Sequence, residues 1–416
     1  EHVTYELNLE GARLAKRAIN KVNPAALIAG VLGPTNRTAS LSPDVSDPAA
    51  RNVTFDYLVE NYHEAINGLL DGGADIILIE TVFDTLNAKA AIFAYLNKCD
   101  ELNFEIPLMI SGTITDASGR TLSGQTVEAF WTSIKHAEPV CVGLNCALGA
   151  SMMRPYLQIL NEKSTFAVSA HPNAGLPNEF GQYEESPQMM ANQIKTFLDE
   201  SLVNIIGGCC GTTPAHLASV VAKLSKRKIS QRTPALDPGA SSLYQYVPFR
   251  QDQTYLAIGE RTNANGSRAF RDALLAEDWE KCVEIARDQI RDGAHMLDLS
   301  VDYVGRDGAA DMSQIASRFA TASTLPIVLD STEPAVIKAG LEHLGGRCVI
   351  NSVNYEDGDG PTSRFAKIMP LVKEHGASVV ALTIDEEGQA RDAEWKLRIA
   401  RRLINDLHDN WGMNVG

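Results

Sequence analysis

Two adjacent cysteines lie between glycines at residues 207–214, in the segment Gly-Gly-Cys-Cys-Gly-Thr-Thr-Pro. Successive side chains of a strand point to opposite faces, so Cys209 and Cys210 can reach one point only where the backbone turns sharply, as glycine allows. Thr213 is typical of a helix N-cap and Pro214 of a first helical residue. The thiols are therefore expected near a helix N-terminus, which lowers thiol pKa and favours thiolates as metal ligands.

A third cysteine, Cys146, lies in the segment Gly-Leu-Asn-Cys-Ala-Leu-Gly at 143–149, which also follows an apolar run. If both runs are parallel strands, their carboxyl ends meet at one edge, and the three thiols converge there. Three thiolates are one ligand short of a closed tetrahedral zinc site, and an open fourth position is typical of catalytic zinc. A substrate thiol could fill that position as a thiolate that stays nucleophilic.

A second interpretation stays open, because the spacing is not a standard Cys-x-x-Cys zinc pattern. In that interpretation the three cysteines are small buried hydrophobic residues. The remaining cysteines fall within expected strands or helices and are interpreted as core residues: Cys99, Cys141, Cys282 and Cys348. Seven cysteines in 416 residues are odd in number and sparse, which argues against a disulfide framework.

Short apolar runs that alternate with amphipathic segments must position these cysteines. In the first half the runs lie at 25–32, 75–80, 107–111, 139–143, 165–169 and 203–206, and in the second half at 255–258, 295–299, 326–330, 347–351 and 378–382. Continuous apolar strands that alternate with helices indicate a parallel sheet covered on its faces. The repeat of about 30 to 40 residues favours an α/β fold with two consecutive (β/α)8 TIM-type barrels.

Six and five strands are fewer than the eight that closure needs, so both barrels are expected to be incomplete in this chain. We expect a first barrel at 1–224 that lacks its first strands and a second barrel at 252–416 that lacks its last strands. The segment between them, 225–251, is rich in basic residues, proline, glycine and serine, and is interpreted as a linker.

The composition excludes several classes of partner. The chain has 37 Lys+Arg against 52 Asp+Glu, a formal net charge of −15, which argues against nucleic acid or an anionic membrane as the main partner. The sequence shows neither a signal peptide nor an apolar stretch of about 18 residues, the length that a membrane span requires. A cytoplasmic protein is therefore expected.

Five segments of the first half resemble the homocysteine-binding barrel of the cobalamin-dependent methionine synthase family. They are Ile-Glu-Thr-Val-Phe-Asp-Thr-Leu-Asn-Ala-Lys from 79, Ser-Gly-Thr-Ile-Thr-Asp-Ala-Ser-Gly-Arg-Thr-Leu-Ser-Gly-Gln from 111, the segments at 143–149 and 207–214, and Ala-His-Pro-Asn-Ala-Gly-Leu-Pro from 170. The resemblance implies that Cys146, Cys209 and Cys210 bind the zinc that activates homocysteine. It also implies that Glu80 meets the α-amino group of the substrate.

Polar residues follow the strands of the second half as well, and carboxylates beside amides suit the donor edge of a pterin. The order Gly-Glu-Arg-Thr-Asn, Asp, Asp-Ser, Asn-Ser, Asp-Glu-x-Gly-Gln is similar to the pterin-binding barrel of the same family. By that resemblance the residues that face the folate are Asn263, Asp298, Asp330, Asn351 and Asp385. Asp330 and Asn351 are counted with the three cysteines as the catalytic set.

Together the two halves imply a methyltransferase that moves the methyl group of 5-methyltetrahydrofolate via cobalamin to zinc-activated homocysteine and forms methionine. The sequence has no Asp-x-His-x-x-Gly element, so cobalamin (methylcobalamin) is expected on a separate module that would be a partner of this chain. Two alternatives stay open: a zinc-dependent homocysteine methyltransferase that uses betaine or a sulfonium donor, and an inactive chain that binds zinc and ligands.

Overall fold

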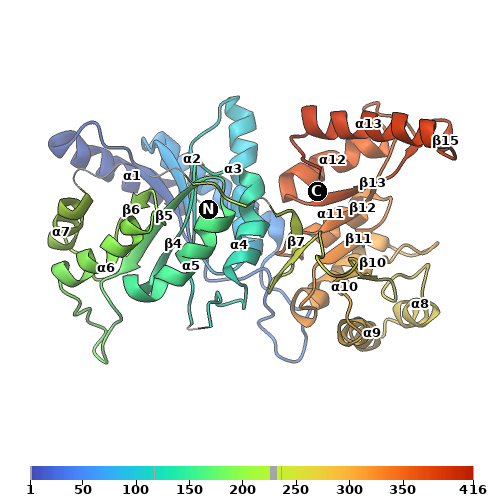
Figure 1. The fold of residues 1–416 in the computed structure, drawn as a ribbon, viewed down its shortest axis with the longest axis horizontal. Helices are drawn as coiled ribbons and strands as arrows, with labels where there is room; N and C mark the ends of the chain where they lie inside the picture. Colours follow the sequence, from blue (N-terminus) through green and yellow to red (C-terminus); the bar gives the residue numbers. More distant parts are fainter. Residues whose placement is uncertain (1, 117, 225–231, 236, 416) are drawn as a thin grey trace. The chain divides into compact units, whose positions relative to one another are not determined.

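The first half of the chain builds a six-stranded parallel sheet whose strands follow one another in chain order. In this computed structural model all residues are described except 1, 117, 225–231, 236 and 416. The strands are β1 (Ala29–Leu32), β2 (Ile76–Val82), β3 (Leu108–Gly112), β4 (Cys141–Gly149), β5 (Ala167–Asn173) and β6 (Ile205–Ile206). The last three are labelled in Figure 1. Each strand lies within four residues of the start of its predicted apolar run.

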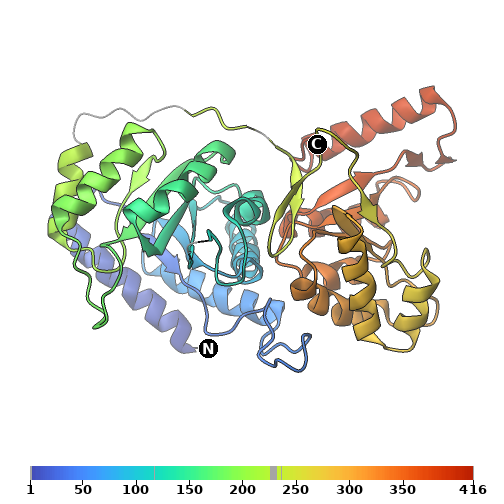
Figure 2. The ribbon, with the colours of Figure 1, turned by 60° about the horizontal axis from the view of Figure 1, so that its bottom comes forward.

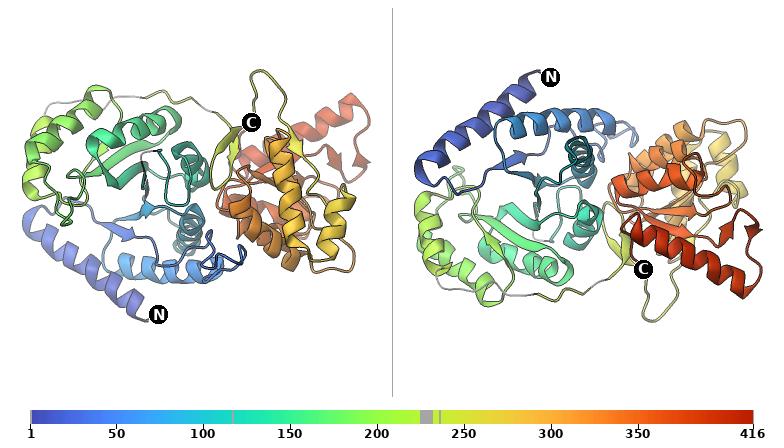
Figure 3. Two further views of the ribbon diagram at one scale, coloured as in Figure 1. Left: turned by 90° about the horizontal axis from the view of Figure 1, so that it is seen from below. Right: turned by 90° about the horizontal axis from the view of Figure 1, so that it is seen from above.

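Helices connect these strands and cover one face of the sheet. They are α1 (His2–Val22), α2 (Phe55–Asp71), α3 (Thr85–Leu102), α4 (Val127–Ile134), α5 (Ala150–Lys163), α6 (Pro187–Asp199) and α7 (Pro214–Leu224), with a short 3₁₀ turn at Lys135–Ala137. Right-handed crossovers between neighbouring strands taken in order place the helices on the same face. Figures 2 and 3 show them outside the curved sheet, as in an arc of a barrel.

Local sequence explains where these helices begin. The N-cap side chains of Thr54, Asp84, Thr126 and Ser186 each accept a hydrogen bond from a backbone N–H two or three residues further on. These bonds satisfy donors that the first helical turn leaves unpaired. The strands between them supply a buried aliphatic core, with Ile77, Ile110, Val142 and Val168 at most 1% exposed.

The second half builds a five-stranded parallel sheet in the order β13-β12-β11-β10-β9. Its strands are β9 (Ile258–Gly259), β10 (Met296–Leu299), β11 (Ile327–Asp330), β12 (Val349–Val353) and β13 (Ser378–Ala381). The helices are α8 (Arg268–Leu275), α9 (Trp279–Arg291), α10 (Gly308–Ala322), α11 (Pro334–Leu341), α12 (Arg364–His375) and α13 (Ala393–Asp409), and a hairpin of β14 (Ile384–Asp385) and β15 (Gly388–Gln389) precedes α13.

The structure adds a feature inside the segment that we interpreted as a linker. Residues Gly239–Ser241 (β7) and Tyr246–Pro248 (β8) pair as an antiparallel hairpin. Ala240 and Val247 pack with Met296, Val328 and Val349, which lie at or near the starts of three parallel strands. The hairpin therefore covers the amino-terminal end of the second sheet. Its strands of three residues are too short to stand out in a stretch dominated by proline, glycine and serine.

The chain divides into two compact units, which are residues 1–38 with 53–237, and residues 39–52 with 238–416. Arg51 shows why residues 39–52 group with the second unit, because its guanidinium donates to the carbonyl oxygens of Ala39 and Ser317. Both sheets are parallel and belong to the α/β class, as predicted. Among the described residues, none of the helices combines the length and the apolar character needed to cross a membrane.

Candidate functional site

The thiols of Cys146, Cys209 and Cys210 come together at the carboxyl edge of the first sheet. The Sγ atom of Cys146 lies 3.2 Å from that of Cys209 and 3.3 Å from that of Cys210, and the last two are 3.9 Å apart. In the part of the chain that the structure describes, this is the one group of three or more metal-ligating side chains whose ligand atoms lie within 4.8 Å of one another. The geometry favours the metal-ligand interpretation over three unrelated core residues.

The backbone around these cysteines takes unusual conformations that bring the thiols to one point. Cys146 and Ala147 both have left-handed backbones, with φ of 61° and 55°, where the pairing of β4 with β5 becomes irregular after Asn145. In the second loop, Gly211 has φ of 78°, and a Cβ there would lie 2.4 Å from Cβ of Tyr183. Only glycine meets both conditions at position 211 without strain.

Hydrogen bonds fix the cysteine loop to the end of β5. The backbone N–H of Cys209 donates to the carbonyl of Pro172, and that of Cys210 donates to Oδ1 of Asn173, 3.1 Å away. The carbonyl of Cys210 accepts in turn from the backbone N–H of Ala174. The loop is therefore held on both sides, which restricts the positions of the two thiols before any metal binds.

Helix α7 follows the loop directly and begins at Pro214, as predicted. Nδ1 of His216 lies 3.2 Å from the backbone nitrogen of Thr213 and 2.8 Å from its hydroxyl, while Nε2 lies 2.8 Å from the carbonyl of Glu185. Since Nδ1 accepts from a backbone N–H, the proton belongs on Nε2. His216 thus occupies the place that Glu or Gln takes in a capping box.

The electrostatics of the three thiols differ. Burial raises the pKa of the Cys146 thiol and raises that of Cys209 to about 12, whereas hydrogen bonding from Cys146 lowers the pKa of the more exposed Cys210. Without a cation the cluster cannot hold three thiolates, because their charges would repel one another in a partly buried site. A divalent metal ion would supply the charge that the cluster lacks.

Glu80 lies on β2, whose pairing with β3 becomes irregular between Ile79 and Val82. Its carboxyl is half-buried, and burial raises its pKa. Among the described residues no cation or hydrogen-bond donor pairs with this carboxylate, so an internal ion pair does not account for its position. A cationic ligand would offset the cost of burying the charge.

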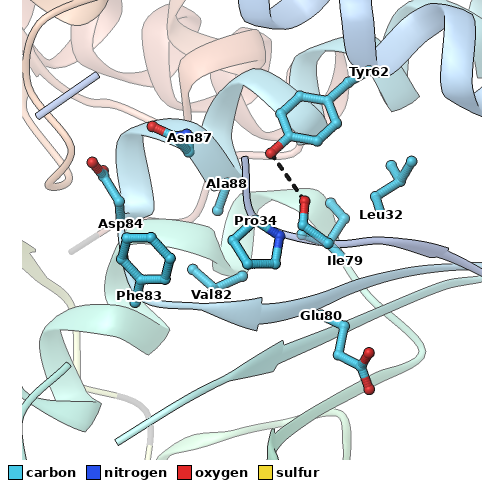
Figure 4. A pocket seen from close by; sticks show the side chains of 11 residues that line it. Leu32, Pro34, Tyr62, Ile79, Glu80, Val82, Phe83, Asp84, Asn87 and Ala88 are labelled. Carbon is cyan, nitrogen blue, oxygen red and sulfur yellow. Dashed lines mark hydrogen bonds between the residues drawn. The ribbon is translucent and has the colours of Figure 1, made fainter. Parts of the chain in front are cut away.

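A small cavity lies beside Glu80 but on the other side of β2. Its lining comes from β1, β2, α2 and α3, and consists of Leu32, Gly33, Pro34, Tyr62, Ile79, Glu80, Val82, Phe83, Asp84, Asn87 and Ala88. In Figure 4 the carboxylate of Glu80 points away from the apolar side chains and from Tyr62, whose hydroxyl donates to the carbonyl of Gly33. The cavity is a gap between sheet and helices, and Glu80 faces the opposite side.

In the second unit three predicted residues, Asn263, Asp298 and Asp330, join one hydrogen-bond network near the ends of their strands. Nδ2 of Asn263 lies 2.8 Å from Oδ2 of Asp298 and 2.7 Å from Oδ2 of Asp330. Asn351 on β12 pairs in register with Asp330 on β11. Burial is the main cause that raises the pKa of Asp298 to about 6, and burial raises the pKa of Asp330 as well.

Asp385 has other partners. Oδ2 of Asp385 accepts from Nε1 of Trp395 at 2.9 Å and lies 3.6 Å from the guanidinium of Arg398, and the Trp395 bond lowers the pKa of this carboxyl. Sequence reasoning singled out Asp385 by motif and could not see these partners on α13. The charge of Glu260, in the Gly-Glu-Arg-Thr-Asn segment, is a further cause that raises the pKa of both Asp298 and Asp330.

Comparison with known proteins finds a family model that matches each half of the chain. Residues 1–224 match the sequence model of homocysteine S-methyltransferase, and residues 259–415 match that of pterin binding enzymes. The first match contains all three clustered cysteines and Glu80. The second contains the five residues at the strand ends of the second unit.

Two curated relatives cover nearly the whole chain. The methionine synthase of Mycobacterium tuberculosis is 48% identical over 412 residues, which cover 98% of this chain and 34% of that protein. The methionine synthase of Mycobacterium leprae is 45% identical over 417 residues, with the same two shares of 98% and 34%. The chain therefore spans about a third of the length of these relatives.

Among solved structures, the apo form of the homocysteine methyltransferase MmuM of Escherichia coli matches with a TM-score of 0.35 and 24% identity. The match covers 52% of this chain and 70% of that one.

Proposed function

The chain belongs to the homocysteine S-methyltransferase family through residues 1–224, and from this premise we propose that it is the substrate-binding portion of a methionine synthase. In this proposal the first unit binds homocysteine and the second binds 5-methyltetrahydrofolate. The observation that carries the proposal is the convergence of the three thiols in the unit that matches this family.

The three thiols fit a zinc ion. At a Zn–S distance of about 2.3 Å, two sulfurs at corners of a tetrahedron are about 3.8 Å apart. The observed separations of 3.2, 3.3 and 3.9 Å approach this value. Cys146, Cys209 and Cys210 would hold the metal on three sides and leave one position for a substrate sulfur. Bound zinc would act as a Lewis acid and lower the pKa of an incoming thiol.

Glu80 supplies the complementary contact for the rest of homocysteine. Its partly buried carboxylate pairs with the α-ammonium group, and this ion pair offsets the burial that raises the pKa of Glu80. The thiol and the amine are then fixed at two points, which orients the sulfur toward a methyl donor. Such orientation is a large part of the rate advantage in a two-substrate reaction.

In the second unit the carboxylates of Asp298 and Asp330 accept hydrogen bonds from the pterin, and Asn263 and Asn351 supply amide groups that donate and accept. With a pKa of about 6, Asp298 is mainly ionised at neutral pH and accepts, whereas near pH 6 about half of it carries a proton and can donate. Asp385, already oriented by Trp395 and Arg398, stays a proposed contact at the edge of this site.

Each substrate binds in its own unit, so a carrier must take the methyl group from one to the other. We propose cobalamin for this role, held by a module outside this chain. The proposal agrees with the share of 34% that the chain covers in the two methionine synthases. A chain with these two sites would operate in the cytoplasm, where both substrates are available.

Two half-reactions with purified, zinc-loaded protein test this function. Supplied methylcobalamin and homocysteine should give methionine, and supplied cob(I)alamin and 5-methyltetrahydrofolate should give methylcobalamin. Cys210→Ala should abolish only the first half-reaction, and Asp330→Ala only the second. Methionine formed equally well from betaine or a sulfonium donor would favour another methyltransferase, and failure of both half-reactions would show an inactive binding chain.

A further inference from the structure

The side chain of Asn145 connects two irregular strand segments in the first unit. It is 1% exposed, and its Oδ1 accepts from the backbone N–H of Thr81 at 3.1 Å and from the hydroxyl of Ser111 at 2.7 Å. Its Nδ2 donates to the hydroxyl of Thr81 at 2.8 Å. Ser111 lies on β3, between the two strands, so the amide of Asn145 on β4 reaches across β3 to β2.

Both connected segments have a backbone that is unusual for their residues. Thr81 has φ of 58°, in the left-handed region that β-branched residues rarely adopt, and Cys146 has φ of 61°. The pairing of β2 with β3 is irregular around Thr81, and that of β4 with β5 is irregular directly after Asn145. Strain of this kind persists only where surrounding contacts hold it, and it gathers at functional sites.

The two segments carry the two groups that the proposed function assigns to homocysteine. Glu80 directly precedes Thr81, and Cys146 directly follows Asn145. The hydrogen bonds of one buried amide therefore fix the backbone beside the carboxylate that binds the amine and beside a thiol that binds the metal.

We propose that Asn145 is a positioning residue that sets the spacing between the sulfur-binding point and Glu80, and thereby selects the chain length of the aminothiol substrate. The inference rests on the proposed function. Homocysteine differs from cysteine by one methylene between the thiol and the amine carbon. A fixed spacing lets homocysteine occupy both points, whereas cysteine must give up one of them.

Thiol binding to the zinc-loaded chain tests the inference by calorimetry, independently of turnover. The probes are homocysteine, cysteine, and 4-mercaptobutanoate, which is homocysteine without its amino group. A difference of one methylene is worth about 10- to 200-fold. We expect the unaltered chain to prefer homocysteine over cysteine within that range, and Asn145→Ala to bring this preference below about threefold. The Kd for 4-mercaptobutanoate should change less than about threefold, because that ligand does not use Glu80.

Glu80→Gln and the double variant separate positioning from general damage. If Asn145 acts through Glu80, the effects of the two substitutions are not additive. The double variant Glu80→Gln/Asn145→Ala should then discriminate homocysteine from cysteine no worse than Glu80→Gln alone. Asn145→Asp keeps an oxygen acceptor for Thr81 and Ser111 and should recover part of the preference. The matched control is Asn204→Ala, because Oδ1 of Asn204 also accepts a backbone N–H, that of Val168, but at the opposite end of the sheet. This control should keep the preference.

The outcomes separate this inference from the function on which it rests. A zinc-loaded Asn145→Ala chain that still prefers homocysteine at least tenfold would overturn the inference and leave the function intact. If Asn145→Ala does not hold zinc, Thr81→Val decides, because it removes only the bond from Nδ2 of Asn145. An unchanged preference in Thr81→Val would then overturn the inference. An unaltered chain that binds neither zinc nor homocysteine would overturn both.

Discussion

Replacing Asp298 by asparagine should stabilise the second unit at alkaline pH, although Asp298 lies in the proposed pterin site. The side chain is 5% exposed. Burial, and to a smaller degree the charge of Asp330, raises the pKa of this carboxyl from 3.8 to about 6, while the amide of Asn263 opposes the shift. An asparagine keeps an oxygen that accepts from Asn263 and removes the charge.

The magnitude follows from linkage between protonation and folding. Because the folded state prefers the protonated carboxyl, the contribution of Asp298 to stability is fully present below pH 3.8 and is lost as the pH rises through about 6. The difference of about 2.2 pH units (6 minus 3.8) corresponds to about 3 kcal/mol of unfolding free energy at pH 8. At pH 5 the same two values give about 1.6 kcal/mol. The gain from Asp298→Asn should therefore shrink by about 1.4 kcal/mol between pH 8 and pH 5.

Urea unfolding followed by tryptophan fluorescence measures this gain for the second unit alone. Three of the four tryptophans, Trp279, Trp395 and Trp411, lie in that unit, so a Trp131→Phe background removes the signal of the first. Pterin binding should weaken in the same variant, since the amide lacks the charge and the titrating proton. An Asp298→Asn variant that is less stable than its parent at pH 8 would refute this account, in which burial of the Asp298 charge destabilises the folded state. A gain in stability that is the same at pH 5 and pH 8 would refute it as well.

Two further predictions concern the cysteine loop. Gly211→Ala should reduce zinc affinity at least tenfold, because φ of 78° and the Cβ of Tyr183 at 2.4 Å both oppose a side chain there; competition with a chelator measures this, and unchanged affinity would contradict it. His216→Gln should keep the zinc and the stability of the first unit, since Gln also fits the capping box, whereas His216→Leu should lose about 1 to 2 kcal/mol of unfolding free energy. Equal stability of the two His216 variants would show that the ring does not cap α7.

The sequence was sufficient to predict the parallel sheets, because buried parallel strands are continuous apolar runs that stand out from amphipathic helices. It also predicted that Cys146, Cys209 and Cys210 meet, since all three follow such runs. The family resemblance grouped Asn263, Asp298, Asp330, Asn351 and Asp385, of which the structure joins the first three by hydrogen bonds.

Features that depend on tertiary contacts could not be predicted in this way. The left-handed backbone of Thr81 has no sequence signal, because β-branched residues disfavour it and tertiary contacts such as the bonds to Asn145 hold it. The partners of Asp385 lie on a helix that begins eight residues later, and the motif around Asp385 does not show which side chains of that helix contact it. The hairpin of β7 and β8 is fixed by packing against strand ends, which a local reading of a loop-like composition cannot show.

X-ray absorption at the zinc edge, with and without homocysteine, tests the central claim most directly. The account predicts one zinc per chain with three sulfur ligands, rising to four when homocysteine is added, as a thiol fills the position that the three cysteines leave open. Cys146→Ser should lower both sulfur counts by one. A zinc content below about half an ion per chain, or a sulfur count that homocysteine does not change, would contradict zinc activation at this site.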